Sequence, residues 1–384
     1  MRVLTALAIW CAGLGAAAQF GKMSVIYDDL GVIYPDHAGV GIGILVSVIG
    51  IVGLIFGTTA GGIVMRLGPR RVMLGALLLG AGVSLVQSFM LPYWAMLLTR
   101  IPEGFSHLAI VVIGPTAIAA TATPRFQGLV MTLWGSFFGL TFTALAFFGP
   151  GLVEAGGPGL LFRVHAVWLL LCVGVLALLL PRDIALPAGT ARLGIIAQHL
   201  DTYRSPSIAA PAMGFVCYTI TYVAALTLLP GAVQPDWAQT VAVAMPLVSI
   251  IVSLTLGVWL LSRMTAVRVV QSGFATVIVA ALGLYATWGH GPSVAAFACL
   301  LAAAMGIAQG ASFAAIPQLN TAATDRALAA GAIAQLGNLG TTTGTPILAL
   351  ILGASGVTGM ALFFIAFSAL GIALHHWLHR RRTI

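Results

Sequence analysis

Three ionisable residues share one face of a single apolar segment. Arg100, Glu103 and His107 follow one another at spacings of three and four residues, which places them side by side on a helix. A carboxylate next to a guanidinium and an imidazole could hold a charge or pass on a proton. Glu103 is the candidate proton carrier, and His107 is the candidate relay because histidine titrates nearest to neutral pH.

A second polar face lies in the first apolar segment. Lys22 is the only lysine of the chain, whereas arginine occurs 16 times, and Gln19 precedes Lys22 by three residues. A charged side chain in hydrocarbon costs at least about 3 kcal/mol, so it is expected to have a partner or a function. Together Lys22 and Arg100 would form an electropositive site for a small anion, with Glu103 as the internal counter-ion.

Each of these residues also has a purely structural interpretation. Lys22 could extend its ammonium group to the membrane surface, beside the acidic residues that end this segment. Arg100 and Glu103 could form a permanent salt bridge that holds helices together. His107 could be a hydrogen-bonded packing residue.

The elements that carry these residues are predicted to be membrane helices. The chain is 60% hydrophobic and only 7% charged, whereas a soluble domain carries about 25% charged residues. Apolar runs of about 20 residues favour helices over the shorter alternating strands of a membrane barrel. The composition therefore predicts an all-α integral membrane protein, with the lipid bilayer as its surroundings.

Glycine, proline and charged residues divide the chain into twelve candidate spans. The spans are 4–29, 38–65, 71–89, 91–120, 127–150, 163–181, 207–230, 238–262, 267–288, 293–319, 327–352 and 358–379. The longest polar stretch separates the sixth span from the seventh. We therefore predict two pseudo-symmetric six-helix bundles, residues 1–181 and 207–384, joined by a cytoplasmic loop of residues 182–206.

The arginines predict the orientation of the chain. If the N-terminus is cytoplasmic, 14 of the 16 arginines fall on the cytoplasmic side, as the positive-inside rule requires. Both termini then lie in the cytoplasm of a cell whose plasma (inner) membrane holds the protein. This distribution explains the net charge of +8 without a nucleic-acid partner.

The two halves of the chain repeat one another. Gly135 and Gly139 in the fifth span have counterparts in Gly340 and Gly344 of the eleventh, at the same four-residue spacing. Repeated halves with a central cytoplasmic loop are typical of transporters whose halves rock around a site near the midplane.

The whole chain resembles the major facilitator superfamily. The family motif between spans two and three, G-x-x-x-D-R-x-G-R-R, is matched by Gly61, Arg66, Gly68, Arg70 and Arg71. Met65 stands in place of the aspartate, and Pro69 in place of a basic residue. The resemblance implies that this loop closes the cytoplasmic side when the transporter opens outward, and that Met65 weakens the closure.

A second family motif, R-x-x-x-G, is matched in span four by Arg100 and Gly104. In span five, Gly149 and Pro150 are present, but Glu154 occupies a position where antiporters carry glycine, which counts against a drug-efflux subfamily. The overall pattern is similar to bacterial members that move small anions such as cyanate.

In this superfamily spans one, four, seven and ten line the central cavity. The resemblance therefore implies that the polar faces of spans one and four meet there. The C-terminal half would add neutral polar and aromatic groups for the substrate, namely Tyr218, Tyr222, Gln309, Gln335 and Asn338.

We therefore expect a monomeric secondary active transporter that takes up a small anionic solute by alternating access. A proton is the expected coupling ion, and no cofactor or metal is expected. One alternative is a proton-coupled exporter of amphipathic compounds, in which Glu103 is the single membrane carboxylate. Another is a non-transporting sensor, which the substitution at Met65 favours. The sequence contains no metal cluster or paired catalytic carboxylates, so we do not expect an enzyme.

Overall fold

The computed structural model describes residues 2–57, 59–123, 127–180, 200 and 202–382. Within these ranges the chain forms helices and no β-strand, which confirms the prediction of an all-α protein. The helices are α1 (Arg2–Val25), α2 (Tyr27–Ile33), the short 3₁₀ helix η1 (Pro35–His37), α3 (Val40–Ser47), α4 (Gly50–Phe56), α5 (Ala60–Leu67), α6 (Pro69–Gln87), α7 (Tyr93–Thr121), α8 (Gln127–Gly135), α9 (Phe137–Gly156), α10 (Pro158–Leu179), α12 (Pro206–Ala232), α13 (Pro235–Val252), the π-helical turn η3 (Ser253–Gly257), α14 (Val258–Leu261), α15 (Ala266–Ala286), α16 (Gly291–Leu319) and α17 (Ala323–Arg382).

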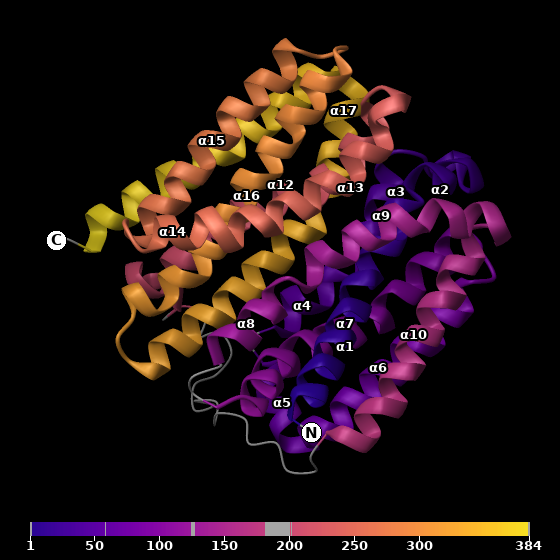
Figure 1. Cartoon of the computed structure of the whole chain (residues 1–384), viewed down its shortest axis with the longest axis horizontal. Coiled ribbons are helices and arrows are strands. Elements are labelled where there is room, and N and C mark those ends of the chain that lie inside the picture. Colours follow the sequence, from indigo (N-terminus) through magenta and orange to yellow (C-terminus); the bar gives the residue numbers. More distant parts are fainter. Residues whose placement is uncertain (1, 58, 124–126, 181–199, 201, 383–384) are drawn as a thin grey trace.

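The helices gather into two bundles (Figure 1). Helices α1–α10 form the N-terminal bundle, and α12–α17 form the C-terminal bundle. The C-terminus is marked at the left of the view and the N-terminus at the bottom, and α2 lies at the upper right. We call the end of the molecule at which α2 lies the α2 end. Most of the predicted linker, residues 182–199 and 201, lies outside the described residues.

Among the described residues, ten helices are long and apolar enough to cross a membrane. The longest of them, α17, contains two helices that meet at Gly356, where φ is 56° and the backbone is not helical. These two helices correspond to the predicted spans 327–352 and 358–379. The total of twelve spans stays a prediction.

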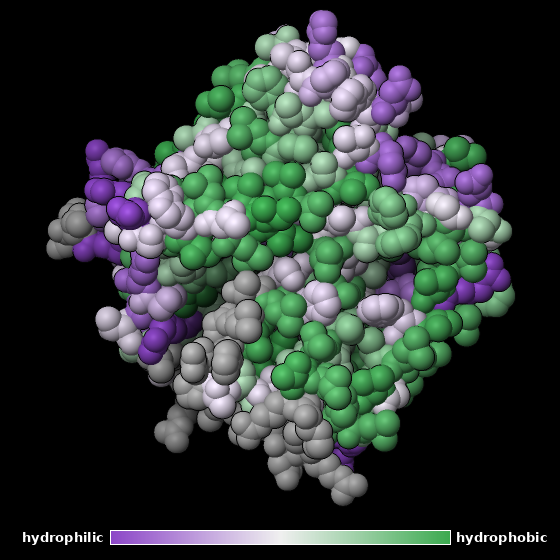
Figure 2. All heavy atoms as spheres, in the orientation of Figure 1, coloured by the Kyte–Doolittle hydropathy of each residue, from purple (hydrophilic) through white to green (hydrophobic). Residues whose placement is uncertain are grey.

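The surface of the molecule fits a bilayer. Figure 2 shows hydrophobic residues over most of the visible face, between hydrophilic residues at its left edge and others at its upper right. Large apolar side chains such as Leu78, Phe147, Leu171 and Ile251 are each at least 50% exposed. A soluble monomer rarely exposes so continuous an apolar surface, so we assign this belt to the hydrocarbon.

The segment of the predicted span 38–65 is not one continuous helix, and the span itself stays a prediction. The helix is interrupted at Val48–Ile49, between α3 and α4, and α4 ends at Phe56, before α5 begins at Ala60. Glycines make the segment adaptable. At Gly53, for example, a Cβ atom would collide with the side chain of Asn338 on α17. The interruptions and the glycines of this segment thus allow it to pack closely against the other bundle.

Two glycine–proline pairs begin helices. Gly68, with φ of 90°, precedes Pro69 at the start of α6, and Gly157, with φ of 71°, precedes Pro158 at the start of α10. Glycine adopts positive φ without steric cost, and proline suits the first helical turn because it has no N–H to leave unpaired. Pro69, the departure from the family motif, therefore has a local reason: it begins α6.

The two bundles are joined by pairs of facing helices. α3 and α4 pack on α17, where the Gln335 amide donates a hydrogen bond to the Leu54 carbonyl (3.3 Å). α9 packs on α13, where the Gln239 amide donates to the Ala146 carbonyl (2.7 Å). These contacts leave α6 and α10 on the far side of the N-terminal bundle (Figure 1).

Within the C-terminal bundle, the substitution Gly344→Ala should lower stability. A Cβ atom at Gly344 would collide with the carbonyl oxygen of Ile220, which is backbone of α12 and cannot rotate away. We expect a loss of about 1–3 kcal/mol in unfolding free energy, measured by denaturant unfolding in detergent. Gly353→Ala is the matched control, because a Cβ there meets no atom within 4 Å. Equal stability of the two variants would contradict this close contact.

Candidate functional site

Lys22 lies inside the N-terminal bundle and is bound on several sides. Its Nζ atom is 2.6 Å from Glu103 Oε1, and it donates hydrogen bonds to Ser84 Oγ (2.9 Å) and Gln87 Oε1 (2.8 Å). It also lies 3.3 Å from His165 Nδ1. The Lys22 side chain is completely buried, which excludes the alternative in which its ammonium extends to the membrane surface.

Arg100 binds the end of a helix as well as a carboxylate. Its Nε donates to the Leu45 carbonyl (2.9 Å) and its Nη2 to the Val46 carbonyl (3.0 Å), at the last turn of α3. Its Nη1 donates to the Gln19 carbonyl (2.9 Å) and to Glu103 Oε2. The last carbonyls of a helix lack helical partners and carry a partial negative charge. Arg100 therefore stabilises the break between α3 and α4.

Lys22, Arg100 and Glu103 form what we call the ionic cluster. Each of the three side chains is 0% exposed, and Glu103 bridges the two cations. Two positive charges and one negative charge leave a surplus of one positive charge. The desolvation of each buried ion costs several kcal/mol. For the surplus positive charge, the cluster contains no second carboxylate whose attraction offsets this cost.

The ionic cluster faces the interior of the N-terminal bundle. Gln19, one turn before Lys22 on α1, donates a hydrogen bond to Ser106 Oγ on α7 (2.9 Å). The Ser106 hydroxyl in turn donates to the Ala76 carbonyl on α6 (2.6 Å). Gln19 and Lys22 thus face α6 and α7, and neither side chain is exposed.

His107 lies on a different side of α1. Its Nδ1 is 3.0 Å from the Ala16 carbonyl, which can only accept, so Nδ1 carries the hydrogen and Nε2 is the basic nitrogen. The ring packs edge-on against Phe20, with centres 5.1 Å apart, and Phe20 also packs against Phe138 of α9. His107 is half-buried, whereas the ionic cluster is sealed.

The predicted substrate residues of the C-terminal bundle lie in separate places. Tyr218 and Tyr222 stack on α12, with ring centres 5.0 Å apart, and both are buried. Gln335 and Asn338 lie on α17 at the contact with α4. Gln309 is half-buried on α16. None of these five bonds to the ionic cluster among the contacts of the described residues.

The motif between spans two and three connects helices of the N-terminal bundle. Arg70 donates to the carbonyls of Ala177 (2.6 Å) and Leu180 (3.0 Å), and so caps the end of α10. The other matched residues are Gly61 and Arg66 in α5, Gly68 before α6, and Arg71 on the exposed side of α6.

Ser84, Gln87 and His165 belong to the polar network but were not predicted from the sequence. Ser84 Oγ lies 2.9 Å from His165 Nδ1, and the Gln87 amide donates to Glu103 Oε2 (2.8 Å). Ser84 and Gln87 are three residues apart in an otherwise apolar stretch of α6. This spacing was the available signal, because two polar groups on one face of a membrane helix indicate a polar neighbour.

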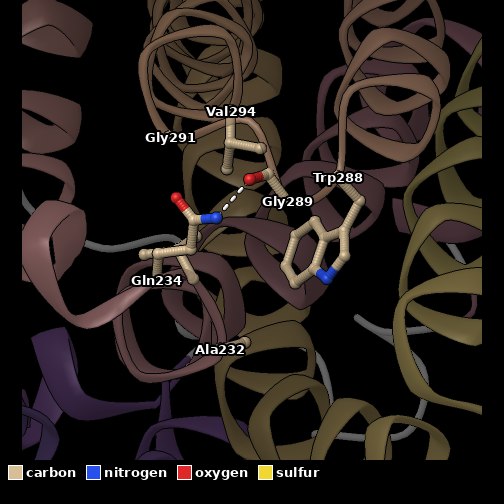
Figure 3. Close-up of a pocket in the computed structure, with 7 residues that line it drawn as sticks. Ala232, Gln234, Trp288, Gly289, Gly291 and Val294 are labelled. Carbon is tan, nitrogen blue, oxygen red and sulfur yellow. Dashed lines mark hydrogen bonds between the residues drawn. The ribbon is translucent and has the colours of Figure 1, made fainter.

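Two cavities lie away from the ionic cluster. One, of about 170 Å³, lies between the bundles and is lined by α1, α2, α9, α12 and α13, including Asp28, Thr227 and Gln239. The other, of about 180 Å³, lies at the turns α12–α13 and α15–α16, where Gln234 bonds to the Gly289 carbonyl opposite the ring of Trp288 (Figure 3). Neither cavity is lined by a residue of the predicted site.

The described residues form two packed bundles of membrane helices, and one bundle contains buried ions. This architecture is that of a multi-pass transporter. A family model for the Major Facilitator Superfamily matches residues 5–321. The chain therefore belongs to the Major Facilitator Superfamily and is a secondary transporter. A search of curated proteins finds no match to this sequence.

Charge arithmetic predicts how substitutions in the ionic cluster affect stability. Glu103→Gln leaves two unpaired cations and should cost about 3–5 kcal/mol of unfolding free energy, because it removes one partner of buried ion pairs. Lys22→Met leaves the neutral pair of Arg100 and Glu103, so it should cost clearly less. Denaturant unfolding in detergent would compare the two variants. A smaller loss for Glu103→Gln would contradict the surplus positive charge.

The contact between bundles at the α2 end should depend on pH. Asp28 lies beyond the candidate span that ends at Val25, and its carboxylate lies against Gly231 of α12. Desolvation by the neighbouring protein, and then the charge of Asp29, raise the pKa of Asp28. A carboxyl whose pKa is higher in the closed contact than in open water favours that contact when protonated, so acid should stabilise it and rising pH should weaken it.

Spin labels on α2 and α12 would measure this pH dependence as a distance distribution. We expect the short distance to lose population as pH rises in the wild type, and to be independent of pH in Asp28→Asn. An identical pH dependence in Asp28→Asn would show that another group is responsible.

Proposed function

We propose that this transporter takes up a small anionic solute together with a proton. The observation that carries the proposal is the surplus positive charge of the ionic cluster, which lies in a completely buried site. An anion bound between the bundles would compensate this charge through the electrostatic field of the cluster. Without the anion, loss of one proton from Lys22 would do the same. Anion and proton would therefore favour one another's binding.

In this proposal the substrate lies between the bundles, in the electrostatic field of the cluster. On the N-terminal side, half-buried His107, next to Phe20, would donate to the anion from Nε2 once that nitrogen is protonated. On the C-terminal side, Tyr218, Tyr222, Gln309, Gln335 and Asn338 offer hydroxyl and amide groups. Glu103 holds both cations in place, so Lys22 and Arg100 attract the anion by charge while they remain bound within their own bundle.

We also propose the orientation that the arginines predict, with both termini in the cytoplasm of a bacterial cell and the α2 end outside. Hydrogen bonds between the bundles then close the outer side: Thr227 donates to Ser24 (3.0 Å), and Gln239 donates to the Ala146 carbonyl. The protein works as a monomer in this proposal, because each bundle supplies its own side of the substrate site.

The second candidate function is the export of amphipathic compounds. Aromatic residues from both bundles favour it, because Phe20 and Phe142 of the N-terminal bundle belong to the same packed core as Phe215, Tyr218 and Tyr222 of the C-terminal bundle. Such a wall suits a lipophilic molecule. An exporter would use the Glu103 carboxylate as its proton carrier.

Thermal unfolding of the purified protein with a panel of small anions, sugars and lipophilic cations tests the proposal. A ligand at 100 times its Kd stabilises by about 2.7 kcal/mol. We expect small anions such as cyanate, formate or nitrate to raise the unfolding temperature, and Lys22→Gln to abolish this effect. Stabilisation by lipophilic cations instead would favour the exporter.

Arg71→Gln is the matched control for this substitution. It removes one positive charge from an exposed position on α6, so the anion effect should persist. If both variants lose the effect equally, the anion responds to total charge and not to the cluster.

A further inference from the structure

Lys22, Ser84 and His165 form a hydrogen-bonded chain across three helices. His165 Nε2 lies 2.9 Å from the Gly15 carbonyl oxygen, which can only accept, so Nε2 carries the hydrogen of the neutral ring. The basic nitrogen is therefore Nδ1. It faces Ser84 Oγ at 2.9 Å and Lys22 Nζ at 3.3 Å.

The Ser84 hydroxyl has an acceptor in each of two directions. Its oxygen accepts from Lys22 Nζ and lies 2.9 Å from His165 Nδ1 and 3.0 Å from the Phe162 carbonyl. When the imidazole is neutral, the hydroxyl can donate to Nδ1. When Nδ1 carries a proton, the ring donates to Ser84, and the hydroxyl turns to the Phe162 carbonyl or, when Lys22 is neutral, to the lone pair of Lys22 Nζ. The chain is thus fully hydrogen-bonded in both protonation states.

His165 is the member of this chain nearest to the surface. Its side chain is 6% exposed, whereas Lys22 and Ser84 are 0% exposed. It lies seven residues after Pro158, where α10 begins at the α2 end, which is about 10 Å along the helix. Lys22 reaches no surface, so a proton can arrive only through a neighbouring group.

The charges around His165 allow either His165 or Lys22, but not both, to carry an extra proton. Lys22 faces it from α1, Arg100 and Glu103 contribute from α7, the neutral Ser84 faces it from α6, and Arg163 on α10 is exposed. With Lys22 neutral, the Arg100–Glu103 pair carries no net charge, and a cation on His165 is tolerated. With Lys22 charged, a second cation 3.3 Å away is strongly disfavoured.

We propose that His165 and Ser84 form the relay that carries protons to and from Lys22. In delivery, protonated Nδ1 of His165 gives its proton to Ser84 Oγ while the Ser84 hydroxyl proton passes to the lone pair of Lys22 Nζ. The imidazolium becomes neutral, the amine becomes ammonium, and the serine regains one hydrogen. Removal is the reverse, and total charge is conserved. This inference rests on the proposed function, because it supplies the coupled proton.

The first test needs no substrate. Nitrogen-15 NMR of histidine-labelled protein in lipid reports protonation at Nδ1, and His165→Gln assigns the His165 signal. We expect Nε2–H alone at high pH and a second proton at Nδ1 on acidification. In Lys22→Gln this step should move to higher pH, because the competing cation is gone. An identical titration in the wild type and Lys22→Gln would overturn the relay.

The second test measures proton movement in liposomes with a pH dye inside, after external addition of nitrate or cyanate. Ser84→Ala should slow anion-driven internal acidification by about 100-fold, a typical contribution of one proton-transfer group, while anion exchange persists. Ser106→Ala is the control, since this serine is equally buried but does not contact Lys22.

The outcomes separate the two proposals. If the liposome interior acidifies at the wild-type rate with the Ser84→Ala variant, the relay is overturned and the proposed function is unaffected. Absence of acidification in the wild type with every anion overturns the proposed function, and the NMR titration then decides whether His165 and Lys22 share a proton.

Discussion

In the low dielectric of the N-terminal bundle, the carboxylate of Glu103 lies between the ammonium of Lys22 and the guanidinium of Arg100. The helices that meet there each contribute a different group. α1 and α7 supply the ions, α6 supplies Ser84 and Gln87, α10 supplies His165, and the end of α3 supplies carbonyl oxygens. Each ion keeps the others in place, because removal of one partner leaves a buried charge unpaired.

The same cluster sets the geometry of the contact between the bundles. Arg100 caps the last turn of α3, and the chain then breaks before α4. Both α3 and α4 pack on α17 of the other bundle. A change in the charge of the cluster would therefore act first on the helix segment that touches the C-terminal bundle. This link connects electrostatics inside one bundle to the relative position of the two.

Much of the fold could be predicted because lipid simplifies the sequence. Hydrocarbon demands long apolar helices, so the composition carries a strong signal. The meeting of Lys22 with Glu103 was also accessible, since a lone ammonium in an apolar segment needs a counter-charge. The position of the break at Val48–Ile49 was not, because Arg100 stabilises it from another helix.

The depth of burial could not be predicted either. Helical spacing places Gln19 and Lys22 on one face of α1. It does not tell whether this face points toward the C-terminal bundle or into the interior of the N-terminal bundle. That depends on which neighbours offer matching polar groups, here Ser84 on α6 and His165 on α10. Serine and histidine side chains can also simply hydrogen-bond between packed membrane helices, so neither residue by itself identified the side that Lys22 faces.

The central claim is that one proton and one anion compensate each other at the buried cluster. It is tested most directly by electrical recording from proteoliposomes adsorbed on a solid-supported membrane, during addition of nitrate or cyanate. The account predicts transport that follows the pH gradient but carries no net charge, so uptake should be insensitive to the membrane potential. A sustained current, with uptake that depends on membrane potential, would contradict it.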